Sequence, residues 1–222
     1  MSARSLLRLA VVAATSLLAA PRAQAEEAWK TYSEKSGARF ERRDVAGSSY
    51  PELRATKEVP LSPAQVLEAV WASVSDLTST KDHKKKLLRS GPDEVVVYQQ
   101  ISVAIVTDRD YTVRIWRTPP ASDGTVEVRY QIANELGPAP DPKYTRLQAI
   151  RGAWTIAPLP SGGTRLRYLA YSEAGGSVPA AFARGAQRDR FDSDFLGVVG
   201  RLPQPVPAAG RAPEGGPAPD AK

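Results

Sequence analysis

Three charged residues, Asp108, Arg109 and Asp110, stand directly before a stretch that alternates like a half-buried strand. Asp108 and Asp110 share a face of an extended strand, so they can act as paired carboxylates. That spacing is common by chance, and no neighbouring residue supplies the third role of a catalytic constellation. Two structural interpretations therefore stand: a carboxylate pairs with Arg109 and fixes the start of the strand, or the charges hold a loop.

His83 is the single histidine of the chain, and it lies in the polar run "KDHKKK". A serine–histidine–aspartate triad needs a histidine held by a buried carboxylate, which a solvated run does not offer. The chain has no cysteine, so it has neither thiolate chemistry nor the usual Cys/His metal ligands. The sequence predicts no catalytic residue, no metal site and no cofactor.

A basic run surrounds this histidine and allows two interpretations. It consists of Lys81, Lys84, Lys85, Lys86 and Arg89. Runs of like charge are usually solvated faces. The functional alternative is transient contact with a membrane surface, worth about 1 kcal/mol per basic residue near anionic lipid.

The two ends of the chain differ from the middle. Residues 1–25 are typical of a signal peptide, with Arg4 and Arg8 before an apolar stretch and Ala23-Gln24-Ala25 as a cleavage site. We expect a periplasmic or secreted protein, cleaved after Ala25; an uncleaved anchor is the alternative. Without a cysteine it is not a lipoprotein, and we expect no transmembrane segment in the mature chain.

Residues 203–222 are rich in Pro, Gly and Ala and are expected to form a disordered tail. One domain over residues 26–202 remains. The formal net charge of +6 falls to +3 when Arg4, Arg8 and Arg22 are removed with the signal peptide. This positive charge is too small to indicate binding to nucleic acid.

The order of elements predicts an α+β fold. A short helix over residues 26–35 precedes strands at residues 37–45 and 50–61. Ser62, Pro63 and Gln65 then form the start signal of a helix, including a capping box. Residues 80–90 are expected to form a short solvated helix. Strands with clean alternation follow, and a long helix over residues 178–202 ends the domain, so we expect one curved antiparallel sheet around this helix.

Several short motifs, taken in order, resemble the START family of steroidogenic-acute-regulatory-related lipid-transfer domains. The likeness covers residues 29–202. It includes "VAGSSYPELRA", the Arg109-Asp110-Tyr111 triplet, "RGAWTIAPL", "GTRLRYLAY" and "EAGGSVPAAF". The resemblance implies a helix-grip fold of the Bet v 1-like superfamily, in which the sheet and the C-terminal helix enclose an apolar cavity for one lipid or sterol-like molecule.

Strand phase, helical phase and this resemblance together predict the residues that line the cavity. They are Tyr111, Val113, Ile115, Val128, Tyr130, Trp154, Tyr168 and Phe182. The resemblance places Asp108, Arg109 and Asp110 at the mouth of the cavity. If Val128 borders ligand space, Val128→Trp should abolish lipid binding with little loss of stability.

Three functions remain open. The first is non-catalytic binding, and possible transfer, of a lipid or similar apolar molecule by a monomeric protein. The second is an enzyme on the same scaffold, since related helix-grip folds include polyketide cyclases. The third is an interaction module whose cavity is filled by its own side chains. Apolar inward positions and scarce catalytic groups favour the first.

Overall fold

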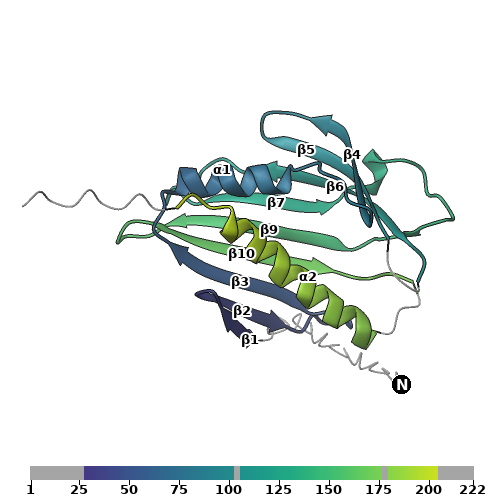
Figure 1. Cartoon of the computed structure of the whole chain (residues 1–222), viewed down its shortest axis with the longest axis horizontal. Coiled ribbons are helices and arrows are strands. Elements are labelled where there is room, and N and C mark those ends of the chain that lie inside the picture. Colours follow the sequence, from purple (N-terminus) through teal and green to yellow (C-terminus); the bar gives the residue numbers. More distant parts are fainter. Residues whose placement is uncertain (1–27, 103–105, 177–179, 205–222) are drawn as a thin grey trace, which may run out of the picture.

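The computed structural model describes residues 28–102, 106–176 and 180–204, and within the last range it leaves out the side chains of residues 180–182. These residues form a ten-stranded curved sheet with two α-helices on one face (Figure 1). The expected α+β helix-grip fold is confirmed. The expected signal peptide and residues 205–222 of the expected tail lie outside the described residues.

The strands follow one another across the sheet in the order β1-β2-β3-β10-β9-β7-β6-β5-β4, and β8 pairs with β6 off this path. Every pairing is antiparallel except the one between β6 and β8. The strands are β1 (Lys30–Lys35), β2 (Ala38–Arg43), β3 (Glu52–Val59), β4 (His83–Ser90), β5 (Glu94–Ile101), β6 (Arg109–Arg117), β7 (Val126–Ile132), β8 (Thr145–Arg146), β9 (Ile150–Pro158) and β10 (Thr164–Ser172).

The expected helix over residues 26–35 is wrong, because Lys30–Lys35 forms the edge strand β1. Tertiary contacts override the local preference here. The Tyr32 hydroxyl donates a 2.7 Å hydrogen bond to Asp192 in the last helix, and its ring lies 6.3 Å from that of Phe40. An extended backbone lets β1 pair with β2 while Tyr32 makes both contacts.

The expected solvated helix over residues 80–90 is also wrong. Residues 83–90 form β4, which pairs with β5 through a tight hairpin. Gly91 closes the turn with a 2.7 Å hydrogen bond from its amide to the carbonyl of Glu94. Because β4 is the edge of the sheet, its charged side chains stay in water while its backbone gains a partner strand.

Helix α1 (Pro63–Val74) begins as the sequence predicts. Ser62 caps it in a capping box: the Gln65 amide donates to the serine hydroxyl, and the Gln65 side chain accepts from the Ser62 amide. Val66 and Val70 are fully buried against the sheet. The helix packs chiefly on β9, β7 and β10.

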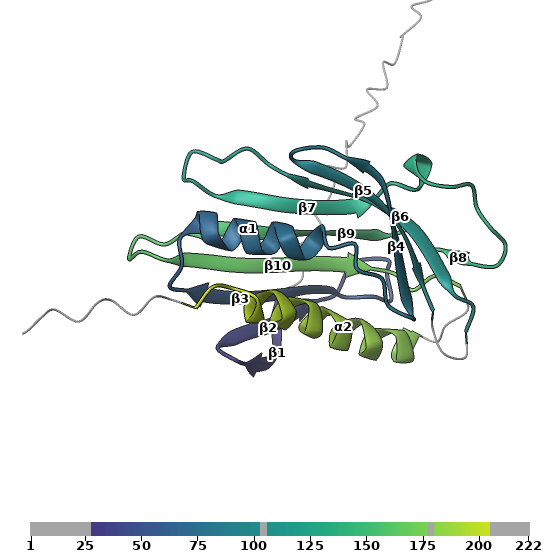
Figure 2. The same ribbon diagram turned by 45° about the horizontal axis from the view of Figure 1, so that its top comes forward.

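Helix α2 (Ala180–Gly200) crosses the same face, and its main contacts are with β3, β10 and α1 (Figures 1 and 2). Phe191, Phe195 and Val198 of α2 belong to the buried core. The inner face of β4, β5 and β6 lies beyond these main contacts of both helices. Among the described residues, no helix is long and apolar enough to span a bilayer.

Gly152 in β9 lets the side chain of Tyr130 pass close to the backbone of β9 on the inner face. A Cβ at this position would lie 2.3 Å from the Tyr130 hydroxyl and 2.2 Å from the Leu169 carbonyl. Because glycine has no side chain, the ring of Tyr130 lies across β9, and its hydroxyl comes within 3.0 Å of the Tyr168 hydroxyl.

Gly152→Val should therefore displace Tyr130 and destabilise the domain by about 2 kcal/mol or more, the cost of overpacking a filled site. Thermal or denaturant unfolding measures the loss. Gly197→Val in α2 is the matched control for adding a β-branched side chain, because its Cβ would meet open space. Equal stability of the Gly152 variant and the parent protein would contradict this packing.

Candidate functional site

Arg109 and Asp110 point to opposite faces of β6, as consecutive strand residues must. Arg109 is buried and lies on the inner side, where its guanidinium donates to the Thr107 carbonyl and, at 3.3 and 3.5 Å, to the carbonyls of Ala174 and Gly175. Arg109 therefore ties the start of β6 to the segment that leads into α2.

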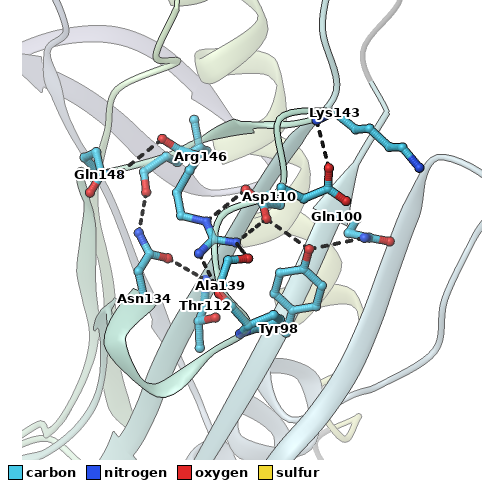
Figure 3. A network of polar contacts seen from close by, with 12 residues as sticks. Tyr98, Gln100, Asp110, Thr112, Asn134, Ala139, Lys143, Arg146 and Gln148 are labelled. Atoms are coloured by element: carbon cyan, nitrogen blue, oxygen red, sulfur yellow. Dashed lines mark hydrogen bonds and ion pairs between the residues drawn. The ribbon is translucent and has the colours of Figure 1, made fainter.

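Asp110 is fully buried on the outer side and pairs with Arg146, whose Nε lies 3.1 Å from Asp110 Oδ1 (Figure 3). The Tyr98 hydroxyl donates a 3.0 Å hydrogen bond to the other carboxylate oxygen. Of the two interpretations of the sequence, the one that pairs a carboxylate with Arg109 fails for Asp110, because strand alternation sends the two side chains to different faces. The hydrogen bonds to Asp110 raise the pKa of Arg146, so its guanidinium stays protonated.

The same ion pair fixes the long connection between β7 and β9 over the outer face. Arg146 also donates to the Pro138 carbonyl at 2.7 Å, and Asn134, in the short 3₁₀ helix η1 (Asn134–Leu136), bonds the Thr112 amide and the Leu147 carbonyl (Figure 3). Asp108 instead accepts a hydrogen bond from Ser102. The two aspartates have separate partners and do not form a carboxylate pair.

One part of the predicted cavity lining is packed against the domain itself. Trp154 stacks on Tyr168 with 4.0 Å between ring centroids and on Phe195 at 5.8 Å, and Tyr168 stacks on Phe191 at 4.8 Å. Val128 pairs with Trp154 across the sheet and has no exposed surface. These side chains form an aromatic core between the sheet and α2.

The other part of the predicted lining lies on β6 and β7. Tyr111, Val113 and Ile115 are buried, and Tyr130 is partly buried. Burial raises the pKa of Tyr111, Tyr130 and Tyr168, so their hydroxyls stay protonated as hydrogen-bond donors. Phe182 lies in α2, and its side chain is outside the described residues. A ligand-contacting role for all eight predicted residues stays a prediction.

Two polar side chains near Tyr111 come from β5, which pairs with β6, and from β4, which pairs with β5. The side-chain oxygen of Gln99 in β5 accepts a 2.9 Å hydrogen bond from the Tyr111 hydroxyl. His83 Nε2 lies 2.6 Å from this Gln99 oxygen. Burial lowers the pKa of His83, which favours its neutral form near pH 7. Sequence reasoning placed His83 in a solvated run because β4 was taken as a helix; strand phase sets it beside Gln99.

Helix α2 carries a partly exposed ion pair. Arg190 Nε lies 2.9 Å from Asp194 Oδ1, one turn along the helix. Burial raises the pKa of Asp194 even though Arg190 lowers it. Arg190 keeps 64% of its side chain exposed and Asp194 keeps 38%. An i, i+4 spacing is visible in the sequence, but it does not show which way the pair points.

The basic run of β4 does not present a single face. Lys81, Lys84 and Lys86 are exposed. Lys85 turns the other way and donates to the Asp76 carbonyl at 2.8 Å, while Arg89 pairs with Glu94 at 2.7 Å. Three lysines are therefore available at this edge of the sheet.

The outer face of β2, β3 and β10 carries a shallow hollow of about 860 Å³. Its walls are charged and largely paired, with Arg54 on Glu41 at 2.8 Å and Arg165 on Glu58 at 2.9 Å. Such a lining suits water rather than an apolar ligand. Within the described ranges, no group of three or more acidic or histidine side chains is placed to hold a metal ion.

Comparison with known proteins supports the fold. No protein-family model matches the chain. An uncharacterized protein of Pseudomonas aeruginosa is 28% identical over 184 residues, which cover 81% of this chain and 89% of that protein. A STAR-related lipid transfer protein of Xanthomonas axonopodis superposes with a TM-score of 0.61 at 21% identity, covering 78% of this chain and 96% of that structure.

The lipid transfer and protein localization domain of human StarD13 gives a TM-score of 0.60 at 17% identity, covering 81% of this chain and 91% of that structure. Human StAR-related lipid transfer protein 5 gives 0.53 at 19% identity. At these identities the likeness shows a shared fold. The START resemblance seen in the sequence is confirmed at that level.

The burial of Val128 changes the outcome expected for Val128→Trp. With no exposed surface and Trp154 beside it, the larger ring should overpack the core and destabilise the protein by about 1–3 kcal/mol. Denaturant unfolding of the ligand-free protein measures this change. Val126→Trp, two residues earlier on the same face of β7 and partly exposed, is the control. Unchanged stability of the Val128 variant would show open space beside this residue.

Proposed function

We propose that this chain, which has the helix-grip fold of the START-related lipid-transfer domains, binds a lipid or similar apolar molecule between its sheet and α2. The observation that carries the proposal is the inner face of β5 and β6. Val97, Val113 and Ile115 make it apolar and are buried within the core cluster, although neither helix makes its main contacts with these strands. A concave apolar surface with a few polar groups is the usual form of a site for an apolar ligand.

The fold adds support. Two of the proteins that superpose on this chain are described as lipid-transfer proteins or domains, and they match it over most of their own length. Fold alone does not determine function, so lipid binding comes to this chain as a proposal.

The surroundings of His83 and Asp110 favour a binding protein over an enzyme. His83 meets the side-chain amide of Gln99 rather than a carboxylate, so no charged partner orients it as a general base. Asp110 forms an ion pair with Arg146 on the outer face. These arrangements favour a binding protein over a cyclase-like enzyme.

We further propose that the protein works outside the cytoplasm, after cleavage at Ala25. The n-region, the apolar stretch and the Ala23-Gln24-Ala25 site support this location. A carrier in that compartment can take up an apolar molecule from one membrane surface and hold it away from water.

One experiment tests ligand and location together. The protein is recovered from the extracytoplasmic fraction of its host and weighed intact by native mass spectrometry. The polypeptide mass should correspond to a chain that begins at Glu26, and additional mass should correspond to one retained lipid. Denaturing mass spectrometry of the same sample should show the polypeptide mass alone. A polypeptide that begins at Met1 contradicts export, and repeated recovery without ligand favours the filled interaction module.

We also propose that the β4 edge makes transient contact with anionic membrane. Lys84 and Lys86 are exposed on adjacent outward positions of this edge strand, and Lys81 is exposed just before it. Two exposed leucines lie near these lysines in the sequence. They are Leu77 and Leu87, with 36% and 40% of their surface exposed.

Reversing both charges, with Lys84→Glu and Lys86→Glu, should weaken binding to vesicles that contain phosphatidylglycerol by about tenfold or more, at about 1 kcal/mol per lost basic residue. Vesicle co-sedimentation at low salt measures it. The control is Arg165→Glu with Arg167→Glu, which changes net charge equally on a strand far from β4. If both double variants lose the same amount of vesicle binding, the loss depends only on net charge, and this result would contradict a docking edge at β4.

A further inference from the structure

The arginines on the outer face of the sheet follow a pattern of paired charges. Those that strand phase sets outward on β2, β3, β6, β7 and β9 each lie 3.8 Å or less from a carboxylate. On β10, Arg165 also has such a partner, Glu58 at 2.9 Å. Arg167, two residues further along β10, is exposed and has no hydrogen bond or ion pair with any described residue. Arg167 is therefore the outward arginine of these strands whose charge no carboxylate balances.

The strand register places Arg167 in a row of polar side chains. Thr56 of β3 pairs with Arg167 on one side and with Arg39 of β2 on the other. All three line the hollow of about 860 Å³ on the outer face. Thr155, on the far side of Arg167, donates to Glu127 at 3.2 Å, whereas the Thr56 hydroxyl has no hydrogen-bond partner among the described residues. This hydroxyl therefore stands between two arginine side chains.

Arg39 can turn toward this row at little cost. Its partner in the structure is Glu34 at 3.4 Å, and the two side chains are 61% and 67% exposed. Exposed pairs of this kind contribute little to stability, because water and salt screen them. Neighbouring strands lie about 4.8 Å apart, so the backbones of Arg39 and Arg167 are separated by about 10 Å. Two arginine side chains can close that gap around a small anion above Thr56.

The charge of the hollow indicates what it can hold. Six basic and three acidic side chains line it. Each of the three glutamates pairs with an arginine, and Lys35 pairs with Asp192 at 2.7 Å. Arg167 and Lys57 have no carboxylate partner in the described part of the chain, and Lys57 donates to the carbonyl of Ser36. These two uncompensated positive charges match a dianion.

We propose that this hollow binds the phosphate group of a small soluble phosphate monoester. Such a group carries about 1.5 to 2 negative charges near neutral pH and offers three strong acceptor oxygens. Guanidinium groups donate to phosphate through pairs of parallel hydrogen bonds, and the Thr56 hydroxyl supplies a further donor. Arg39 and Arg167 hold two sides of the phosphate, with Thr56 beneath it. The site lies on the opposite face of the sheet from the proposed lipid site and does not depend on it.

Neighbouring carboxylates limit the ligand to one phosphate group. Glu58 stands two residues from Thr56 on the same face of β3, and Glu41 stands two residues from Arg39 on the same face of β2. An extended polyanion would meet these charges on both sides. Glu34 and Glu58 are mostly exposed, so the flat surface of an anionic bilayer would meet them before it reached Thr56. A small molecule that enters the hollow avoids both.

Glycerol phosphate is a suitable probe, because it carries one phosphate monoester and no apolar chain. It is titrated into the isotope-labelled protein at low salt, and the backbone amide signals are followed by NMR. The signals of Thr56 and Arg167 should shift and saturate. Sodium chloride at the same ionic strength should not reproduce these shifts. Acetate should bind about tenfold more weakly, because a carboxylate offers one charge and two oxygens.

Two substitutions test the contacts separately. Arg167→Gln should weaken the binding of glycerol phosphate by about tenfold or more, because it removes charge-assisted donors. Arg129→Gln is its matched control, since it removes the same charge from the outer face of β7, where Arg129 pairs with Glu127 at 2.6 Å. Thr56→Val keeps charge and shape and should weaken binding roughly three- to tenfold. Thr31→Val, at an exposed position of β1 outside the hollow, should have no effect.

The outcomes decide between a defined site and diffuse charge. Equal losses in Arg167→Gln and Arg129→Gln, or full binding by Thr56→Val, would overturn the site, as would the absence of a saturable shift. Retention of the protein by vesicles that contain phosphatidic acid, without binding of glycerol phosphate, would assign the hollow to a membrane and contradict a soluble ligand. Lipid retention in native mass spectrometry is a separate result, so either proposal can fail alone.

Discussion

The buried ion pair between Asp110 and Arg146 fixes the geometry on which the inner face depends. Arg146 joins β8 to the outer side of β6 and thereby positions the connection between β7 and β9. Because Asp110 is held outward, strand alternation sets Arg109 and Tyr111 inward. Breaking such a pair by removing one partner leaves a buried charge and is strongly destabilising, commonly by about 3–5 kcal/mol.

From this anchor the inner face divides into two regions with different physical roles. Toward β3 and β10, stacked rings of Trp154, Tyr168 and Phe191 pack on α2 at close distances and supply stability. Toward β4, the same sheet carries hydroxyl, amide and imidazole groups. Tyr130 connects the two regions, since its ring crosses Gly152 and its hydroxyl meets Tyr168. The polar groups lie at the boundary of a packed core rather than in solvent.

The sequence predicted the elements whose signals are local. The capping box at Ser62 and the alternation of β6, β7 and β10 need only neighbouring residues, and all of them appear in the structure. The two edge strands were missed because most of their side chains are in water on both faces, so apolar periodicity is absent. The partner of Asp110 was missed for another reason: it lies 36 residues away, and only the folded chain brings it near.

The limits of sequence reasoning fall on residues of the edge strand β4 and of helix α2. His83 and Lys85 belong to β4, a strand taken for a helix, and the direction of the Arg190–Asp194 pair depends on how α2 is rotated over the sheet. The core and the caps can be shared by many proteins of this fold, because they depend on size and periodicity. Selectivity for one ligand requires charges and donors at fixed separations, which periodicity along the sequence does not encode. A fold resemblance at 21% identity can therefore be correct about the architecture without identifying the ligand, because side chains rather than the fold select it.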